Sequence, residues 1–367
     1  MSASFDEQPY IAIISGGVGT RLWPRSRRQS PKQLIQLAAG RSLIQQTFGR
    51  IAPLTSPERI FVVTVAAQKD AIRDQLPELP PENIIAEPEG RNTAMAIGLA
   101  ITHIAAIDPN AMMISVGSDH FIGDDEAYRR TLQAAMGGAS GGKHLVTVGI
   151  SPTSPDTGYG YIQRGEVIGT HAGIEIFQVL DFKEKPSLEV ARKYIRSQEY
   201  LWNGNYFIWR IPAALAAYSE FAPDILERMN VLRESLGRDS YGAVLADTYK
   251  HVRAVPIDTA IIEKATNVLT VPGQFPWIDV GTWGGAYKIA DIEDGNYRTG
   301  SRCRRVLFLD SMGCLVDSSD RAIVLIGLED VIVIDTDDAL LVCARDKAQR
   351  VGEVVGRLGE EGLEQLL

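Results

Sequence analysis

Residues 10–34 read YIAIISGGVGTRLWPRSRRQSPKQL and carry the strongest local signal of the fold. The stretch begins with an apolar run rich in β-branched residues, Tyr10–Ser15, which predicts a buried strand. This strand runs directly into Gly16, Gly17 and Gly19, whose missing Cβ atoms let the backbone turn tightly and bring N–H donors against an anion. The sequence therefore predicts a strand followed by a phosphate-binding loop.

Basic residues follow the loop with no acidic residue among them: Arg21, Arg25, Arg27, Arg28 and Lys32. Such a cluster would repel itself without a polyanion, so we expect several of these side chains to face a triphosphate. The stretch is not a Walker A loop, because no Gly-Lys-Ser/Thr follows at the required spacing. It is not a GxGxxG motif either, because Leu22 holds the last position. The alternative is a glycine turn beside a solvated basic surface.

Outward from this stretch, short apolar runs alternate with amphipathic helical segments, which favours a mainly parallel sheet flanked by helices. Residues 156–210 are less regular and are interpreted as an insertion that carries a second half-site. The predicted strands are Tyr10–Ser15, Ile60–Thr64, Asn83–Glu87, Met112–Gly117 and Leu145–Ile150. The predicted helices are Ser42–Ile51, Thr93–Ile107 with Asn92 or Thr93 as its N-cap, Ser187–Gln198, Ala213–Met229 and Trp283–Asp291.

After about Gly295 the pattern changes to closely spaced β-like runs, followed by an amphipathic helix over Lys347–Leu358. We therefore predict an α/β domain over residues 1–295 and a small β domain over residues 296–367. Asp335 and Asp337 form a DxD pair in the second domain. Between two β-like runs, this pair is interpreted as a hairpin turn and not as a metal site.

The composition excludes several classes of protein. The 367 residues include 37 Lys and Arg against 46 Asp and Glu, and the net charge of −9 makes nucleic acid an unsuitable partner. The beginning of the chain has no leader-like pattern, and no apolar run is long enough to span a membrane. Cys303, Cys314 and Cys343 show neither a disulfide framework nor zinc-binding spacing, so we expect a cytoplasmic protein.

SGGVGTRLWPRSR, followed by PKQ, resembles the amino-terminal signature of the sugar-1-phosphate nucleotidylyltransferases, in particular of the mannose-1-phosphate guanylyltransferases. Further motifs follow in the family order: AEPEGRNTA, VGSDH, GYGYI, FKEKP, WNGNYFIW, IDTAIIEKA and WIDVGTW. The resemblance thus covers nearly the whole chain. It implies a Rossmann-like catalytic domain with these nucleotide-binding residues: Gly16, Gly17, Gly19, Thr20, Glu87, Asn92 and Thr93.

Glu87 lies at the end of a predicted strand. In related uridylyl and thymidylyl enzymes, a glutamine at the equivalent place reads the edge of the pyrimidine. Guanine presents two donors there, N1–H and the 2-amino group, and a carboxylate can accept both. We therefore hypothesise that Glu87 contributes to the choice of base. The alternative is a carboxylate that caps the next helix.

Asp119 follows a predicted strand at the edge where α/β sheets collect ligands, and Asp279 lies far away in WIDVG. Two hard oxygen ligands together with triphosphate oxygens suit Mg²⁺, and the resemblance implies this metal pair. His120 is expected to have a hydrogen-bonded structural or substrate-orienting role, because the histidines show no metal-binding spacing.

The resemblance also implies a sugar half-site. Lys185 would contact the sugar phosphate, although a lysine with acidic neighbours is more often part of a surface ion pair. The hydroxyl groups would be recognised by Gly160, Glu184 and Asn203. Aromatic side chains of the segment WNGNYFIW could stack on the sugar or pack in the core.

The reaction implied is transfer of GMP from GTP to α-D-mannose 1-phosphate by in-line attack on the α-phosphorus, with Arg21, Lys32 and Lys185 as catalytic cations. Three alternatives remain open at this point. The chain could be a guanylyltransferase for another hexose or heptose 1-phosphate or with relaxed base choice, a nucleotide-sugar-dependent glycosyltransferase, or a catalytically silent subunit.

The β domain resembles the short, left-handed β-helix-like extension of the bacterial enzymes, which implies a homodimer. Longer relatives carry a phosphomannose isomerase domain that this sequence does not reach, so no isomerase activity is expected.

Overall fold

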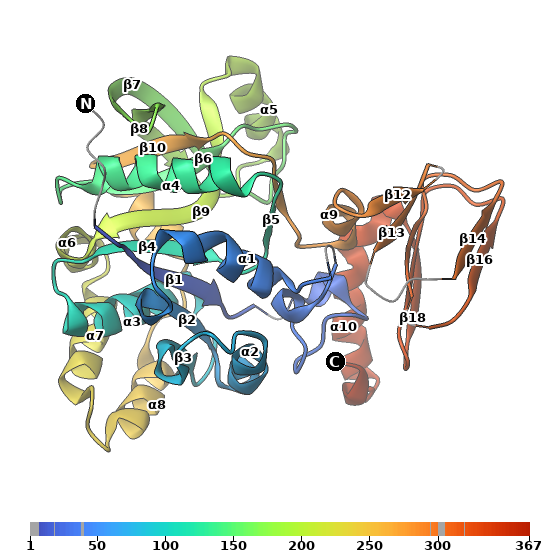
Figure 1. Cartoon of the computed structure of the whole chain (residues 1–367), viewed down its shortest axis with the longest axis horizontal. Helices are drawn as coiled ribbons and strands as arrows, with labels where there is room; N and C mark the ends of the chain where they lie inside the picture. The colour runs from blue at the N-terminus through green and yellow to red at the C-terminus, as the bar shows by residue number, and fades with distance from the viewer. Residues whose placement is uncertain (1–6, 18, 38–39, 294, 300–304, 319) are drawn as a thin grey trace.

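The computed structural model describes residues 7–17, 19–37, 40–293, 295–299, 305–318 and 320–367. Within them, the largest element is a mixed sheet in the order β3-β2-β1-β4-β9-β6-β10-β8-β7 (Figure 1). All of its strands run in one direction except β8 and β9, so the sheet is mainly parallel. Its strands are β1 (Tyr10–Ser15), β2 (Ile60–Val65), β3 (Ile84–Glu87), β4 (Met112–Gly117), β6 (Leu145–Ile150), β7 (Tyr161–His171), β8 (Ile174–Lys183), β9 (Tyr200–Arg210) and β10 (Val268–Gly273).

The sheet confirms the predicted fold class and the five predicted strands to within one residue at each end. The interpretation of residues 156–210 as an insertion is wrong for β9. This strand pairs with β4 on one side and with β6 on the other, so it lies in the middle of the sheet. The sequence left open whether the aromatic side chains of the segment WNGNYFIW in this strand stack on a sugar or pack in the core. In the structure they are buried in the core.

Alternate residues of β1 point to opposite faces of the sheet. Tyr10 and Ala12 pack with α3 (Asn92–Ile107), α6 (Ile211–Phe221), α7 (Pro223–Ser235) and α8 (Tyr241–His251). Ile11 and Ile13 pack with α1 (Leu43–Ile51), α2 (Lys69–Gln75) and α4 (Asp125–Ala139). Because both faces are covered, the polar loops at the strand ends are the parts of the sheet that remain open to a ligand.

The helices correct four boundary predictions. The helix predicted over Lys347–Leu358 is α10, which covers Val351–Glu360 and follows a 3₁₀ helix over Arg345–Arg350. The N-cap of α3 is Arg91, which makes no side-chain cap, and not Asn92 or Thr93. Pro223 begins a new helix, so the helix predicted over Ala213–Met229 is divided into α6 and α7. The helix predicted over Trp283–Asp291 is shorter, because α9 covers only Trp283–Tyr287. By contrast α5 (Leu188–Ser197) begins as expected, with the Ser187 side chain accepting a hydrogen bond from the Val190 N–H.

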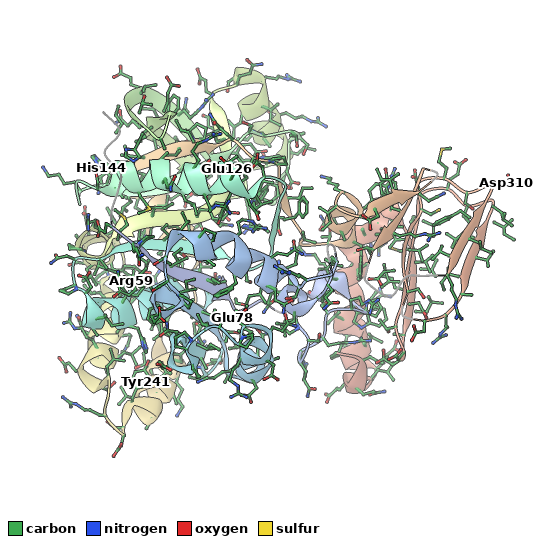
Figure 2. The ribbon with its side chains drawn as sticks, in the orientation of Figure 1. Arg59, Glu78, Glu126, His144, Tyr241 and Asp310 are labelled. Atoms are coloured by element: carbon green, nitrogen blue, oxygen red, sulfur yellow. The ribbon has the colours of Figure 1, made fainter. Side chains whose placement is uncertain are left out.

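Helix α8 is linked to α3 by a partly buried polar contact. The Tyr241 hydroxyl, labelled in Figure 2, lies 2.7 Å from Nε2 of His103. Burial lowers the pKa of His103 to about 4, so this imidazole is neutral near pH 7. The contact therefore joins two neutral groups.

The second domain is β-rich and lies beside the first, with α10 (Val351–Glu360) between them (Figure 1). Parallel ladders join β13 to β15 and β15 to β17, while a separate parallel ladder joins β14 to β16, as in a β-helix. The hairpin predicted at DTDD is confirmed, because the Thr336 N–H donates to the Ala339 carbonyl oxygen. The first strand, β12 (Asp291–Glu293), pairs with β13 and lies before the predicted boundary at residue 296. The other strands are β13 (Asn296–Thr299), β14 (Val306–Leu309), β15 (Leu315–Asp317), β16 (Ile323–Ile326), β17 (Val331–Asp335) and β18 (Leu340–Ala344).

A shared apolar cluster holds the two domains together. It includes Leu22 and Trp23 after the glycine loop, Trp283 of α9, and Ile332 and Val351 of the β-rich domain. The cluster joins the beginning of the chain to its end, so the phosphate loop rests on the second domain. No helix among the described residues is both long and apolar enough to cross a membrane.

Candidate active site

A cavity of about 670 Å³ opens at the carboxyl ends of β1, β3 and β4. This is the edge at which α/β sheets usually bind ligands. Most of the residues predicted for the two half-sites line this one cavity: Gly16, Gly17, Arg21, Glu87, Asn92, Thr93, Asp119, Gly160, Glu184, Lys185, Asn203 and Asp279. The structure thus brings together residues that are more than 200 positions apart in the sequence.

Lys32 joins the two predicted metal ligands. Its Nζ forms an ion pair with Oδ2 of Asp119 and lies 3.9 Å from Oδ1 of Asp279. Asp279 reaches this place because β11 (Trp277–Asp279) pairs antiparallel with β5 (His120–Ile122), with Asp279 opposite His120. The two carboxylates therefore face one ammonium group, although Lys32 itself does not line the cavity.

The electrostatics of this triad follow from burial and proximity. Burial lowers the pKa of Lys32, but the neighbouring carboxylates of Asp119 and Asp279 outweigh it, and the net shift is upward. Burial raises the pKa of Asp119, but the Lys32 ammonium outweighs it, and the net shift is downward. Lys32 and Asp119 are therefore both charged near neutral pH.

The place of Lys32 depends on Gly19. Gly19 has a φ of +74°, in the left-handed region that favours glycine. A Cβ atom there would lie 2.6 Å from Cβ of Lys32 and 2.7 Å from its Cγ. Gly19 thus has a definite role even though it does not line the cavity: it lets the lysine stem cross the loop. The neighbouring Val18 lies outside the described residues.

The basic cluster does not face the cavity as a whole. Arg21 lines the cavity, and Thr20 begins the short 3₁₀ helix that carries Arg21. The expectation of a shared triphosphate role is wrong for Arg25, whose guanidinium forms a two-point contact with Asp317, and for Arg27, which pairs with Asp338. Acidic groups of the β-rich domain, which the local sequence could not show, neutralise these two arginines.

Glu87, which the sequence predicted to bind the nucleotide, lines the cavity and is almost completely buried. The Tyr249 hydroxyl of α8 donates a hydrogen bond to its Oε1 over 2.9 Å. Burial raises the pKa of Glu87 to about 7, and the Tyr249 hydrogen bond opposes this shift. The capping alternative for Glu87 is wrong, because the cap residue of α3 is Arg91.

Asn92 and Thr93 also line the cavity. Asn92 has a φ of +65°, and its Oδ1 accepts a hydrogen bond from the Thr93 N–H. The Thr93 hydroxyl oxygen accepts from the Ile257 N–H over 2.9 Å, which ties the start of α3 to the segment IDTAII. These bonds fix the wall of the cavity beside Glu87.

The residues predicted for the sugar half-site lie at strand ends that are side by side in the cavity. Glu184 follows β8, and its Oε1 lies 2.9 Å from Nζ of Lys185, which is itself largely exposed. A Cβ atom on Gly160 would lie 2.6 Å from Oε2 of Glu184, so only glycine allows this approach. The Asn203 N–H donates to the Gly160 carbonyl oxygen over 2.8 Å.

His120 is buried, and its Nδ1 lies 2.9 Å from the Tyr206 hydroxyl. Burial lowers its pKa, although the Asp119 and Asp279 carboxylates oppose the shift. This hydrogen-bonded position fits the structural or substrate-orienting role expected from the sequence, and His120 also lines the cavity.

Three residues at the site had no predicted role: Tyr249, Asp258 and Gln349. Tyr249 bonds Glu87, Asp258 lines the cavity, and Gln349 accepts a hydrogen bond from Arg21 over 3.2 Å. Asp258 lies within the quoted motif IDTAIIEKA, which was the only signal that could have identified it. Tyr249 and Gln349 carry no local signal, because their partners are more than 160 residues away.

The donor set at the triad fits Mg²⁺. Mg²⁺ takes one or two protein carboxylates and completes its shell with water and substrate phosphates. Asp119 and Asp279 supply two carboxylates that face a common point, and that point is next to the glycine loop. In the part of the chain that the structure describes, no group of three or more His, Cys, Asp or Glu side chains forms a complete protein cage.

Comparisons with known proteins show what the chain is similar to. The nucleotidyl transferase family profile matches residues 11–293, and the profile described as MannoseP isomerase/GMP-like beta-helix domain matches residues 304–358. The Xanthan biosynthesis protein XanB of Xanthomonas campestris pv. campestris (strain B100) is 37% identical over 95% of this chain and 73% of its own length. The mannose-1-phosphate guanylyltransferase of Escherichia coli (strain K12) is 34% identical over 96% of this chain and 74% of its own length.

A solved structure is also similar over almost the full length. It is a Thermus thermophilus protein described as a mannose-1-phosphate geranyltransferase, with a TM-score of 0.86 and 33% identity over 96% of this chain and 99% of the other. Together with the matched profiles and relatives, this similarity places the chain in the nucleotidyl transferase family, among the mannose-1-phosphate guanylyltransferases.

Proposed function

We propose that the protein transfers GMP from GTP to α-D-mannose 1-phosphate, which yields GDP-mannose and pyrophosphate. One observation carries the proposal: Asp119 and Asp279 line the same cavity as the glycine loop and the predicted sugar-binding residues, and the Lys32 ammonium lies between these two carboxylates. Two polyanionic substrates can approach each other only where positive charge offsets their repulsion. The relatives with this activity are similar over nearly the whole chain.

The nucleotide would bind across the glycine loop, with Gly16 and Gly17 offering backbone N–H groups to its phosphates. Arg21 and Lys32 would stabilise charge on the triphosphate and on the leaving pyrophosphate. The ionised Glu87 would accept hydrogen bonds from N1–H and the 2-amino group of guanine. Asn92 and Thr93 hold the adjoining wall in place.

The acceptor would bind with its phosphate on Lys185 and its hydroxyl groups toward Glu184. A phosphate monoester is largely ionised near neutral pH, so it needs no general base, and its oxygen can attack the α-phosphorus in line. Pyrophosphate then leaves from the opposite side. The protein's work is therefore to position the substrates and neutralise their charge, and no side chain acts as a nucleophile.

Mg²⁺ held by Asp119 and Asp279 would supply further charge neutralisation between the two anions. Lys32 would then share these two carboxylates with the metal ion and would also stabilise charge on the phosphates.

The decisive experiment measures pyrophosphate release for GTP, ATP, UTP and CTP, each combined with the 1-phosphates of mannose, glucose, fucose and a heptose. We expect release with GTP and mannose 1-phosphate at a rate at least tenfold above every other pair. Equal rates with another sugar phosphate would identify a different guanylyltransferase. Release with no pair would refute the proposal and leave a silent subunit or a glycosyltransferase.

We also propose that the protein is a homodimer that forms through the β-rich domain. The parallel pair β14 and β16 sets Leu307 beside Val324 and Leu309 beside Ile326. All four side chains are more than half exposed, between 51 and 64%, at the end of the molecule marked by Asp310 in Figure 2. Such a patch suits a second copy of itself, because the same surface serves both subunits in a two-fold dimer.

Sedimentation velocity would test the dimer with Leu309→Asp, and Leu180→Asp on β8 is the control at a similarly exposed apolar residue. We expect a monomer for the first variant and an unchanged dimer for the second. A wild-type monomer at micromolar concentration would refute this proposal.

A cytoplasmic location is also proposed, because Cys314 and Cys343 are free thiols, which suits a reducing compartment.

A further inference from the structure

The side-chain amide of Asn203 has no hydrogen-bonding capacity left for a ligand. Its Nδ2 donates to Oδ1 of Asp258 over 2.7 Å and to Oδ1 of Asn205 over 2.9 Å. Its Oδ1 accepts from the Thr147 hydroxyl and from the Asn205 N–H, both over 3.2 Å. A primary amide donates two hydrogen bonds and accepts two, so all four are in use. Asn203 is also only 2% exposed, which leaves little surface for a sugar to contact.

Asp258 is the group toward which this network points. It begins the π-helical turn Asp258–Ile262 and lines the cavity together with Glu184 and Lys185. Asn203 bonds its Oδ1, and within the described residues no other side chain donates a hydrogen bond to its carboxyl group. The Asp258 backbone N–H also interacts with this carboxyl group, but a carboxylate has about four acceptor positions, so acceptor capacity remains for a donor that enters the cavity.

We propose that Asp258 is a sugar-binding residue, whose carboxyl group accepts a hydrogen bond from a ring hydroxyl of the hexose 1-phosphate, and that Asn203 is the positioning residue that orients this carboxyl. The inference rests on the proposed function and deepens it. It assigns the reading of one hydroxyl to a residue in IDTAIIEKA, and it makes Asn203 act through that residue.

The charges around Asp258 agree with this role. Burial raises its pKa to about 7, the neighbouring Glu184 carboxylate adds to the rise, and Lys185 opposes it. A buried carboxyl without enough donors is unfavourable, and a sugar hydroxyl supplies one. The two acidic groups also limit which ligand atom can bind here, because Glu184 and Asp258 together would repel a phosphate oxygen.

The test uses the full chain and two variants, Asp258→Asn and Asn203→Leu. In Asp258→Asn, the new amide oxygen can take the place of Oδ1 and still accept the hydrogen bond from Asn203. The new NH₂ group then takes the place of Oδ2, so a donor faces the cavity instead of an acceptor. The matched control is Asp247→Asn, at a largely exposed aspartate on α8. Pyrophosphate release is measured with mannose 1-phosphate and with its 2-, 3-, 4- and 6-deoxy analogues, and GTP affinity is measured separately by direct binding.

We expect Asp258→Asn to raise the KM for mannose 1-phosphate about 10- to 100-fold, the range for one hydrogen bond to a charged group, and to leave GTP affinity within about twofold. For the wild type and Asp247→Asn, kcat/KM for one deoxy analogue should be lower than that for mannose 1-phosphate by a similar factor. For Asp258→Asn, the two values should differ by less than about twofold. Asn203→Leu should show the same analogue pattern, because its Asp258 carboxyl is no longer oriented.

Other outcomes would overturn the inference. If Asn203→Leu abolishes the discrimination and Asp258→Asn keeps it, Asn203 reads the sugar directly. If Asp258→Asn lowers the rates with all analogues by one common factor, its role is structural. Thr147→Val removes a single donor to Asn203 and provides a milder variant if the others do not fold. Its kcat/KM for mannose 1-phosphate should fall about 2- to 5-fold, and its discrimination against the same deoxy analogue should weaken. If the wild type is inactive with mannose 1-phosphate and its analogues but active with another sugar phosphate, the result contradicts the proposed function and not the role of Asp258.

Discussion

Replacing Lys32 by methionine would test the charge balance between Lys32 and the two carboxylates of Asp119 and Asp279. Methionine keeps an unbranched apolar stem of similar length and removes the ammonium that faces Asp119 and Asp279. Two effects should follow. The substrates lose a cation that stabilises the triphosphate, and the two carboxylates lose the group that competes with a divalent metal ion.

The magnitude can be worked from the distances. At 3.9 Å and an effective dielectric constant of about 20, the attraction between Lys32 and Asp279 is about 4 kcal/mol before solvent screening. The three side chains are 15, 19 and 29% exposed, so water reduces this value, and about 1.4 kcal/mol remains as a working figure. This difference corresponds to about tenfold tighter binding of Mg²⁺ or Mn²⁺ to the variant without nucleotide. Loss of a donor that stabilises the transition state should at the same time lower kcat by about 100- to 1000-fold.

Isothermal titration with Mn²⁺ in the absence of nucleotide measures the first effect, and pyrophosphate release measures the second. Lys193→Met is the matched control, since Lys193 is an exposed lysine on α5 that pairs with Glu189. We expect the control to match the wild type in both assays. A Lys32→Met variant with kcat within about tenfold of the wild type, or with weaker metal binding, would refute the reasoning.

Three further predictions concern other parts of the structure. Arg25→Met leaves the buried Asp317 carboxylate without its two-point partner and should cost about 3 kcal/mol of unfolding free energy, and urea denaturation equal to that of the wild type would argue against this coupling of the domains. Gly160→Ala pushes Glu184 out of place, so the KM for mannose 1-phosphate should rise about tenfold while the KM for GTP stays constant; a rise in both would show a general disturbance. The pKa of Glu87 is raised to about 7, so its ionised acceptor form is lost as the pH falls through 7. The KM for GTP should therefore increase below pH 7 more steeply in the wild type than in Glu87→Gln. Parallel pH profiles of the two proteins would remove Glu87 from base recognition.

The sequence was informative where a residue's environment is set by its own neighbours in the chain. The run Tyr10–Ser15 alternates between the two apolar faces of the sheet and then meets glycines, so both the strand and the loop could be read locally. The same holds for Asp119, which simply follows β4. The family motifs added Asp279 and Lys185, which the structure places in the same cavity.

The remaining features depend on contacts across long stretches of sequence. Arg25 looked like a phosphate ligand because its partner, Asp317, is 292 residues away. Strand β9 looked like part of an insertion because its antiparallel pairing with β4 and β6 is not encoded in its own pattern. The saturated hydrogen bonds of Asn203 were hidden for the same reason, since Thr147 and Asp258 lie more than 50 residues to either side.

The proposed reaction is a direct attack of the sugar phosphate on GTP, with both substrates held only by cations and hydrogen bonds. The stereochemical course at the α-phosphorus tests this mechanism most directly, with one diastereomer of guanosine 5′-(1-thiotriphosphate) as donor and mannose 1-phosphate as acceptor. A single in-line displacement predicts inversion of configuration in the thio-GDP-mannose product. Retention would mean two successive displacements through a covalent guanylyl-enzyme, and it would contradict the proposed roles of Lys32, Asp119 and Lys185.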